Sequence, residues 1–211
     1  MKKLFLSFFT IYLLFSLSSC LKPGDDEFHD AMKAYGKQRY QEALDLFQQA
    51  IDQDCNYSKE IIYSMMANVH LAQKNLESAA ECYEKALSSK PDYRLYTTLG
   101  SIYHASGKDS KAEESYTNAV NMDSSRPEAY ASLGSLYLGQ GLNDKAIEFL
   151  QKAEKINTKL AVVHANLAVA YATKKDSDSA QKELNLAEQY QCENLEQFKQ
   201  RVQELLAKDA E

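Results

Sequence analysis

Cysteine and histidine are the side chains in this sequence that could bind a metal, form a disulfide or carry a covalent group. The four histidines lie far apart, without HExxH or HxxxH spacing and without a nearby cysteine cluster. They are His29, His70, His104 and His164. No GxSxG turn, glycine-rich phosphate loop or isolated carboxylate pair in an apolar setting occurs either. The sequence therefore predicts no metal site, no cofactor and no enzymatic activity.

Cys20 is the one residue whose surroundings point to a specific modification. Lys2 and Lys3 precede an apolar run over residues 4–17, which is the layout of a secretory signal. The run is shorter than the roughly 20 residues that a membrane-spanning helix needs, so an anchor helix is the weaker alternative. Its end, Leu17-Ser18-Ser19-Cys20, resembles a bacterial lipobox. The resemblance implies a signal peptide over residues 1–19 and a lipidated Cys20, whose acyl chains would anchor the mature protein.

The lipobox resemblance also leads to a prediction of location. The residues from 20 to 26 would form a short tether to a first helix beginning near Asp26, so the body would sit close to the membrane. Leu21, rather than an aspartate, follows Cys20, and by enterobacterial sorting rules this favours the outer membrane, facing the periplasm. In a bacterium with a single membrane, the same sequence would place the protein on the outer face of that membrane.

Charge limits the classes of partner. The chain has 211 residues and a formal net charge of −6, which becomes about −8 without Lys2 and Lys3. An acidic chain that lacks a basic patch with interspersed aromatic residues is repelled by phosphate, so no nucleic acid partner is expected.

Three further cysteines remain, Cys55, Cys82 and Cys192. Their spacing resembles neither a metal site nor a redox motif, which favours buried or half-buried thiols and leaves a disulfide between two of them open.

The elements that must position these residues follow from an internal repeat. With three prolines, seven glycines and no tryptophan, the composition favours helices. Alanines recur at spacings of 36, 33, 34 and 34, and three further columns keep step with them. The alanine column is Ala43, Ala79, Ala112, Ala146 and Ala180. Seven residues later stand Ala50, Ala86, Ala119, Ala153 and Ala187, and four residues later Phe47, Tyr83, Tyr116, Leu150 and Leu184. Twelve residues earlier stand Ala31, Ala67, Gly100, Gly134 and Ala168.

This pattern resembles the tetratricopeptide-repeat (TPR) family, whose units of about 34 residues are pairs of antiparallel helices. The resemblance implies an all-α fold, a right-handed superhelical solenoid of about five units over residues 27–194. We place the units at residues 24–57, 60–93, 93–126, 127–160 and 161–194. Apolar residues at helical spacing in residues 195–211 predict a capping helix that covers the last repeat.

The resemblance further implies a concave groove lined by the first helix of each unit. The predicted partner-binding residues are Phe28, Met32, Tyr35, Ser64, Asn68, Leu71, Thr97, Ser101, His104, Ala131, Ser135 and Leu138, continued in the last unit by Ala165, Val169 and Ala172. The side chains on this face are mostly small and uncharged, so the groove suits an extended segment or a helix of a partner protein. The alternative is that these residues merely face solvent. A clamp for acidic C-termini is not supported, because the face lacks the cations it needs.

The sequence thus predicts a lipid-anchored, non-enzymatic scaffold or adaptor of the bacterial envelope, for instance in a secretion, pilus, outer-membrane assembly or cell-wall complex. The alternative is a periplasmic accessory subunit of a solute transport system. Self-association is left open, as are the partner and the pathway.

Overall fold

The computed structural model describes residues 22–207, and within this range the chain forms eleven helices and no strand. The chain divides into two compact units, one ending at Pro91 and the other beginning at Asp92. The helices of the first unit are α2 (Pro23–Gly36), α3 (Tyr40–Asp52), α4 (Lys59–Ala72) and α5 (Leu76–Ser89). Those of the second are α6 (Tyr93–Ala105), α7 (Asp109–Met122), α8 (Pro127–Gly139), α9 (Asn143–Ile156), α10 (Ala161–Thr173), α11 (Ser177–Gln189) and α12 (Leu195–Ala207).

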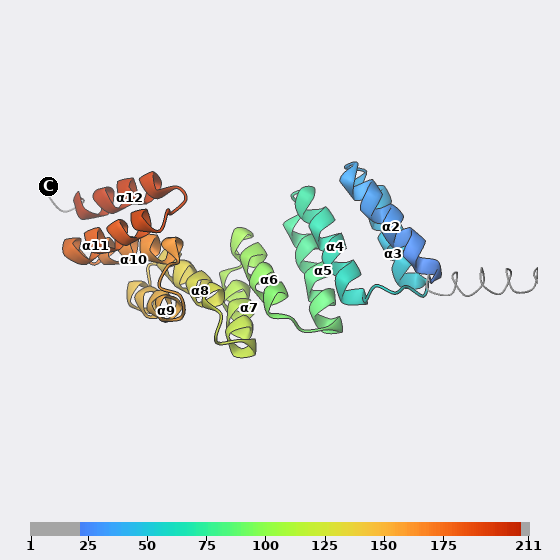
Figure 1. Ribbon diagram of the computed structural model, residues 1–211, viewed down its shortest axis with the longest axis horizontal. Coiled ribbons are helices and arrows are strands. Elements are labelled where there is room, and N and C mark those ends of the chain that lie inside the picture. Colours follow the sequence, from blue (N-terminus) through green and yellow to red (C-terminus); the bar gives the residue numbers. More distant parts are fainter. Residues whose placement is uncertain (1–21, 208–211) are drawn as a thin grey trace, which may run out of the picture. The chain divides into compact units, whose positions relative to one another are not determined.

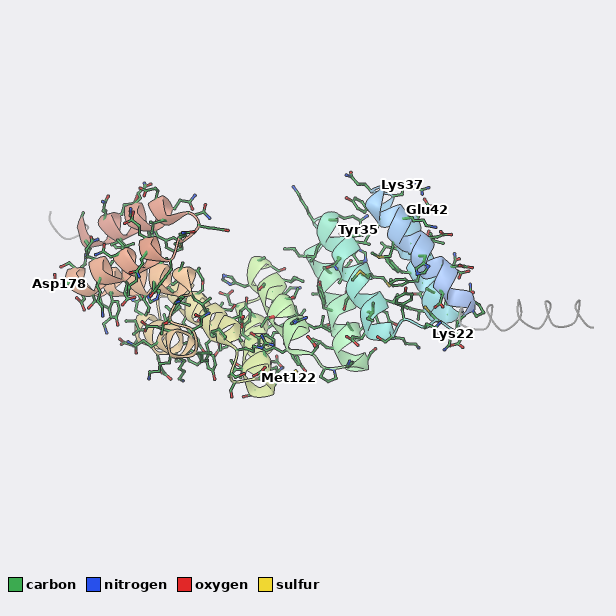
Figure 2. All side chains as sticks on the ribbon, viewed as in Figure 1. Lys22, Tyr35, Lys37, Glu42, Met122 and Asp178 are labelled. Carbon is green, nitrogen blue, oxygen red and sulfur yellow. The ribbon has the colours of Figure 1, made fainter. Side chains whose placement is uncertain are left out.

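Consecutive helices pack as antiparallel pairs, from α2 with α3 to α10 with α11 (Figure 1). All ten alanines of the two predicted columns are completely buried. The large side chains between them, such as Phe47 and Leu150, are also buried, because they fill the space that the alanines leave between the helices. Charged side chains such as Lys37, Glu42 and Asp178 are exposed (Figure 2). The predicted all-α fold of five helix pairs is confirmed.

The same turn ends the first helix of every pair. Two residues beyond the helix, the backbone adopts a left-handed conformation with φ between 60° and 74°. The turn residues are Gln38, Lys74, Gly107, Gly141 and Lys175. The next residue donates its N–H to a carbonyl five residues back, as Asn75 does to His70 at 2.9 Å and Leu142 to Tyr137 at 2.9 Å. This closure satisfies a carbonyl at the end of the helix and reverses the chain.

Helix α12 is the predicted cap, and it packs against α10 and α11. Its Val202 is buried, and Phe198 and Leu205 pack against the same apolar cluster on α10. Ala165 and Ala172 of α10 are completely buried, Ala172 in the apolar cluster that contains Val202 of α12, and neither can contact a partner. Their predicted place in an open groove is wrong for that reason.

The first helix begins at Pro23, three residues before the expected start near Asp26. Proline suits the first helical position, since its ring fixes φ and the missing N–H has no partner there anyway. The predicted signal peptide and Cys20 lie outside the described residues. Within residues 22–207, none of the helices combines the length and the apolar character needed to cross a membrane.

Candidate functional site

The predicted groove residues fall into two classes in the structure. Phe28 is buried: its ring stacks on Tyr57 at a centroid distance of 3.8 Å and packs edge-on against Phe47, so it belongs to the core. The remaining eleven are exposed or half-buried and stay candidates. The exposed ones are Met32, Ser101, His104 and Ser135.

Two of these candidates also bond to the second helix of their own pair. Tyr83 donates its hydroxyl to Asn68 Oδ1 at 2.8 Å, and Tyr116 donates to Ser101 Oγ at 3.1 Å. In both cases the tyrosine lies fifteen residues after its partner, so the contact repeats with the unit. A charged substitution at Asn68 or Ser101 would therefore disturb helix packing as well as any binding surface.

The second unit contains a cavity of about 580 Å³ where four predicted groove residues, His104, Ser135, Leu138 and Val169, lie together. This is within the usual range of roughly 300–1,000 Å³ for binding pockets. Its walls come from α6, α8, the start of α9, α10 and α12. The lining residues are His104, Ser135, Leu138, Gly139, Gly141, Asn143, Asn166, Val169, Thr173, Gln197, Phe198, Arg201 and Leu205.

The cavity offers both donors and acceptors of hydrogen bonds. Asn143 Oδ1 is buried and receives no hydrogen bond from any described residue. The side chain of Asn166 is almost fully buried, and Arg201 is exposed with five N–H donors. Among the described lining residues, Arg201 alone carries a permanent charge. A peptide backbone, which presents N–H and C=O groups in alternation, matches this set of groups.

Sequence reasoning missed the part of the cavity that α12 contributes. Residues 195–211 were interpreted only as a cover for the last repeat, yet Gln197, Phe198 and Arg201 form one wall of the cavity. Asn143 was also missed, since it opens α9 and lies outside the first helix of its repeat. One feature of the sequence could have suggested this wall: a helix that caps the last repeat also brings its own polar residues close to that repeat.

The cysteines of the described chain, Cys55, Cys82 and Cys192, are free thiols. Burial raises the pKa of each one above its ordinary value, which keeps the thiols protonated and poorly nucleophilic. The preference for buried or half-buried thiols is confirmed, and these residues offer no reactive centre.

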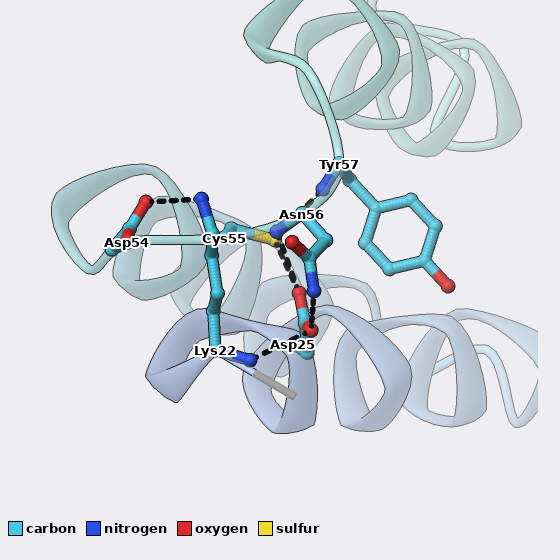
Figure 3. Close-up of polar contacts among 6 residues, drawn as sticks. All are labelled: Lys22, Asp25, Asp54, Cys55, Asn56 and Tyr57. Atoms are coloured by element: carbon cyan, nitrogen blue, oxygen red, sulfur yellow. Dashed lines mark hydrogen bonds and ion pairs between the residues drawn. The ribbon is translucent and has the colours of Figure 1, made fainter. Parts of the chain in front are cut away.

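A polar network holds the start of α2, close in sequence to Cys20 (Figure 3). The buried carboxylate of Asp25 accepts hydrogen bonds from Asn56 N and Nδ2, both at 2.7 Å, and from Lys22 N at 3.0 Å. Cys55 Sγ donates to it at 3.3 Å, and Lys22 Nζ pairs with Asp54 at 2.9 Å. The backbone N–H groups of Asn56 and then Lys22 lower the pKa of Asp25 to about 2. The network fixes the first residues of α2 to the loop after α3.

A second polar cluster is buried between α9, α10 and α11. His164 Nδ1 lies 2.7 Å from Glu183 Oε2, and His164 Nε2 lies 2.9 Å from the carbonyl oxygen of Thr158. Glu154 is half-buried beside them, and one ligand atom from each of the three side chains lies within 4.8 Å of the others. No motif in the sequence predicts this cluster, because the three residues come from three different helices and their spacing matches no ligand motif.

Family comparisons agree with the repeat architecture. Models of the tetratricopeptide repeat match residues 34–102 and 127–159, and a model described as TPR repeat matches residues 100–141. Together they span residues 34–159, from the end of α2 through α9, and so take in the second, third and fourth helix pairs and the second helix of the first. The chain is a tetratricopeptide-repeat protein. TPR proteins are generally non-catalytic, and their fold is suited to protein–protein interaction.

Solved TPR structures share this fold. A tetratricopeptide repeat protein from Parabacteroides merdae ATCC 43184 aligns with a TM-score of 0.76 at 17% identity, over 88% of this chain and 74% of that one. MamA aligns with a TM-score of 0.68 at 21% identity, over 78% and 89%. YrrB, described as a TPR protein with an unusual peptide-binding site, aligns with a TM-score of 0.65 at 20% identity, over 82% and 90%.

One curated relative is the human protein O-mannosyl-transferase TMTC2. It is 27% identical over 114 residues, which is 53% of this TPR chain but 13% of the human protein. The match therefore concerns a small part of that enzyme.

Proposed function

We propose that this TPR protein is a lipid-anchored adaptor of the bacterial envelope, which binds an extended segment of a partner protein in the cavity of its second unit. The observation that carries the proposal is the cavity itself, where Arg201, Asn166 and Asn143 line one space of about 580 Å³. A groove built from rigid helices binds without reorganisation of its walls, which favours affinity.

The polar groups of the cavity favour an extended peptide over a packed helix. A helix satisfies its own backbone groups and presents an apolar face, whereas this cavity mixes apolar Leu138 and Phe198 with amide side chains. An extended segment could bond Asn143 and Asn166 through its backbone and place an acidic side chain against Arg201. YrrB, which shares the fold, is described as having a peptide-binding site, and this supports the class of ligand.

Cys20 supplies the anchor in this proposal. Only Leu21 and Lys22 separate it in the sequence from the start of α2 at Pro23, so the reach of the tether is about 10 Å. The lipid would thus hold the first repeat at the membrane surface, at the outer membrane if enterobacterial sorting applies. Chains labelled with a fatty-acid analogue should carry the label and sediment with membranes, while Cys20→Ser should do neither. A labelled Cys20→Ser protein would contradict the anchor without affecting the cavity.

Site-specific photocrosslinking tests the cavity. A photoreactive amino acid at Ser135 should crosslink one defined segment of a partner in cells, whereas the same group at exposed Lys182, outside the cavity, should not. Arg201→Glu should abolish the crosslink from Ser135. Arg94→Glu makes the same charge change at an exposed site of the same unit and should leave the crosslink intact.

Equal crosslinking from Ser135 and Lys182, or a crosslink that survives Arg201→Glu, would exclude the cavity as the binding site. Far-UV circular dichroism confirms that each variant keeps its helices. A partner identified as a solute-binding protein, together with self-association, would favour the transport accessory over the envelope scaffold.

A further inference from the structure

Three buried or half-buried polar residues break the repeat pattern and meet at one place in the second unit. His164 stands at the repeat position that is tyrosine in three other repeats, in Tyr63, Tyr96 and Tyr130. Glu183 stands at the position of Cys82, Ser115 and Phe149. Glu154 stands at the position of the apolar residues Ile51, Leu87 and Val120. The fifth repeat has exposed Glu188 at the position of Glu154, and the first has Glu27 at that of His164, but within residues 22–207 only His164, Glu183 and Glu154 meet as one buried or half-buried group.

Hydrogen bonding prepares His164 to act as a ligand. The carbonyl oxygen of Thr158 can only accept, so the 2.9 Å contact places a proton on His164 Nε2. The 2.7 Å contact between His164 Nδ1 and Glu183 Oε2 needs a proton between the two atoms, and a metal ion bound there would displace that proton and accept the Nδ1 lone pair. Metal-binding histidines are held in this way, with the second ring nitrogen donating to a backbone carbonyl or a carboxylate.

Charge gives a second argument. His164 is 2% exposed and Glu183 is 6% exposed, and a buried carboxylate is costly unless a cation balances it. Within residues 22–207, no lysine or arginine pairs with Glu183 or Glu154. Without a metal, the one cation that pairs with Glu183 in the described part of the chain is His164 itself, when its ring carries two protons. A metal dication would replace that proton and would balance Glu154 as well.

We propose that His164 Nδ1, Glu183 and Glu154 bind a divalent first-row transition metal ion, with Zn²⁺ as the best fit. An imidazole ligand disfavours Mg²⁺ and Ca²⁺, which prefer oxygen ligands throughout. Zn²⁺ bonds of about 2.0–2.2 Å put tetrahedral ligand atoms about 3.4 Å apart. The Nδ1 to Oε2 separation of 2.7 Å would widen by less than about 1 Å, which rotation of the Glu183 side chain allows. The fourth position remains for water.

The three ligands come from α9, α10 and α11, so the ion would join the fourth repeat to the fifth. It would stabilise this part of the second unit without touching the lining of the cavity. The metal proposal is therefore independent of peptide binding, and either can fail alone.

Zinc titration of the full chain tests the site. The protein is purified without a histidine tag, stripped with chelator and titrated against a chromophoric zinc indicator. We expect one Zn²⁺ per chain and a higher Tm when it is bound. Loss of a residue that only supports a metal ligand already lowers metal affinity by about 10–100-fold. Glu154→Gln removes a ligand itself, so it should weaken zinc binding by at least about tenfold. Glu154 is half-buried with no described partner, so this variant should keep the fold.

Glu188→Gln is the matched control, because Glu188 holds the same repeat position one unit later but is exposed. It should bind zinc like the wild type. Cobalt loading should give visible bands of nitrogen and oxygen coordination without a thiolate charge-transfer band. Absence of tight zinc binding, equal affinity of Glu154→Gln and wild type, or a thiolate band lost in Cys192→Ser would each overturn the proposal.

Discussion

Replacement of Gly134 by alanine tests the close helix packing on which every repeat depends. A Cβ atom at Gly134 would lie 2.5 Å from Leu150 Cγ and 2.8 Å from Leu150 Cδ2, far inside van der Waals contact. Leu150 is fully buried, so its side chain cannot turn out toward solvent without unpacking the core. Overpacking of this kind costs about 1–3 kcal/mol, and alanine returns about 1 kcal/mol of helix propensity. We expect a net loss of up to about 2 kcal/mol in the free energy of unfolding.

Gly139 provides the matched control on the same helix, because a Cβ there meets nothing within 4 Å. Gly139→Ala should leave stability unchanged or raise it by up to about 1 kcal/mol. Urea denaturation followed by circular dichroism measures both variants. In a Leu150→Ala background, which removes Cγ and both Cδ atoms, the cost of Gly134→Ala should fall. If Gly134→Ala stabilises the protein as much as Gly139→Ala does, the packing argument is wrong.

Four further changes have defined outcomes. Asp25→Asn should lower the Tm at neutral pH. The hydrogen bonds stabilise the ionised carboxylate and lower the pKa of Asp25 to about 2. The contribution of Asp25 to stability is therefore complete above about pH 4 and is lost as the pH falls toward about 2. In an acid titration, the stabilities of mutant and wild type should converge near about pH 2. Tyr137→Phe removes the 2.6 Å hydrogen bond to Glu113 and should cost about 1 kcal/mol in urea denaturation. Lys74→Gly should stabilise the protein by about 1 kcal/mol in the same assay, because glycine adopts the φ of 60° without steric cost. Val202→Ala should cost about 2 kcal/mol by opening a cavity under α12, and a smaller effect would mean that α12 is loosely packed.

Features that repeat along the chain could be predicted from the sequence. The alanine columns identified the buried faces because close helix contacts admit only small side chains, and Phe47 and Leu150 take the predicted core positions. The capping helix followed from the same reasoning, since a last repeat without a cover would expose its apolar face. The predicted start near Asp26 lies three residues after the observed start at Pro23, because the hydrogen bonds from Asn56 that fix Asp25 come from a loop 31 residues away in the sequence.

Features that occur once could not be predicted in this way. Glu154, His164 and Glu183 come together only when three helices pack, and their spacing of ten and nineteen residues matches no ligand motif. Lys74 and Lys175 occupy left-handed turn positions that glycine usually takes, so residue type did not mark these turns. Phe28 was placed in the groove by its repeat phase, but Tyr57, which stacks on it, lies in a loop between repeats.

Helix α12 links stability to binding in the second unit. Its apolar side places Val202 against α10, while its other residues bring Arg201 and Gln197 to the cavity. A ligand that contacts Arg201 can bind fully only when α12 is docked, so binding and docking must reinforce each other. Val202→Ala should loosen α12 and therefore weaken peptide binding, although Val202 does not line the cavity. A peptide that binds Arg201 should in turn slow the hydrogen exchange of the α12 backbone amides. If the peptide protects α8 and α10 but leaves α12 exchange unchanged, α12 takes no part in binding.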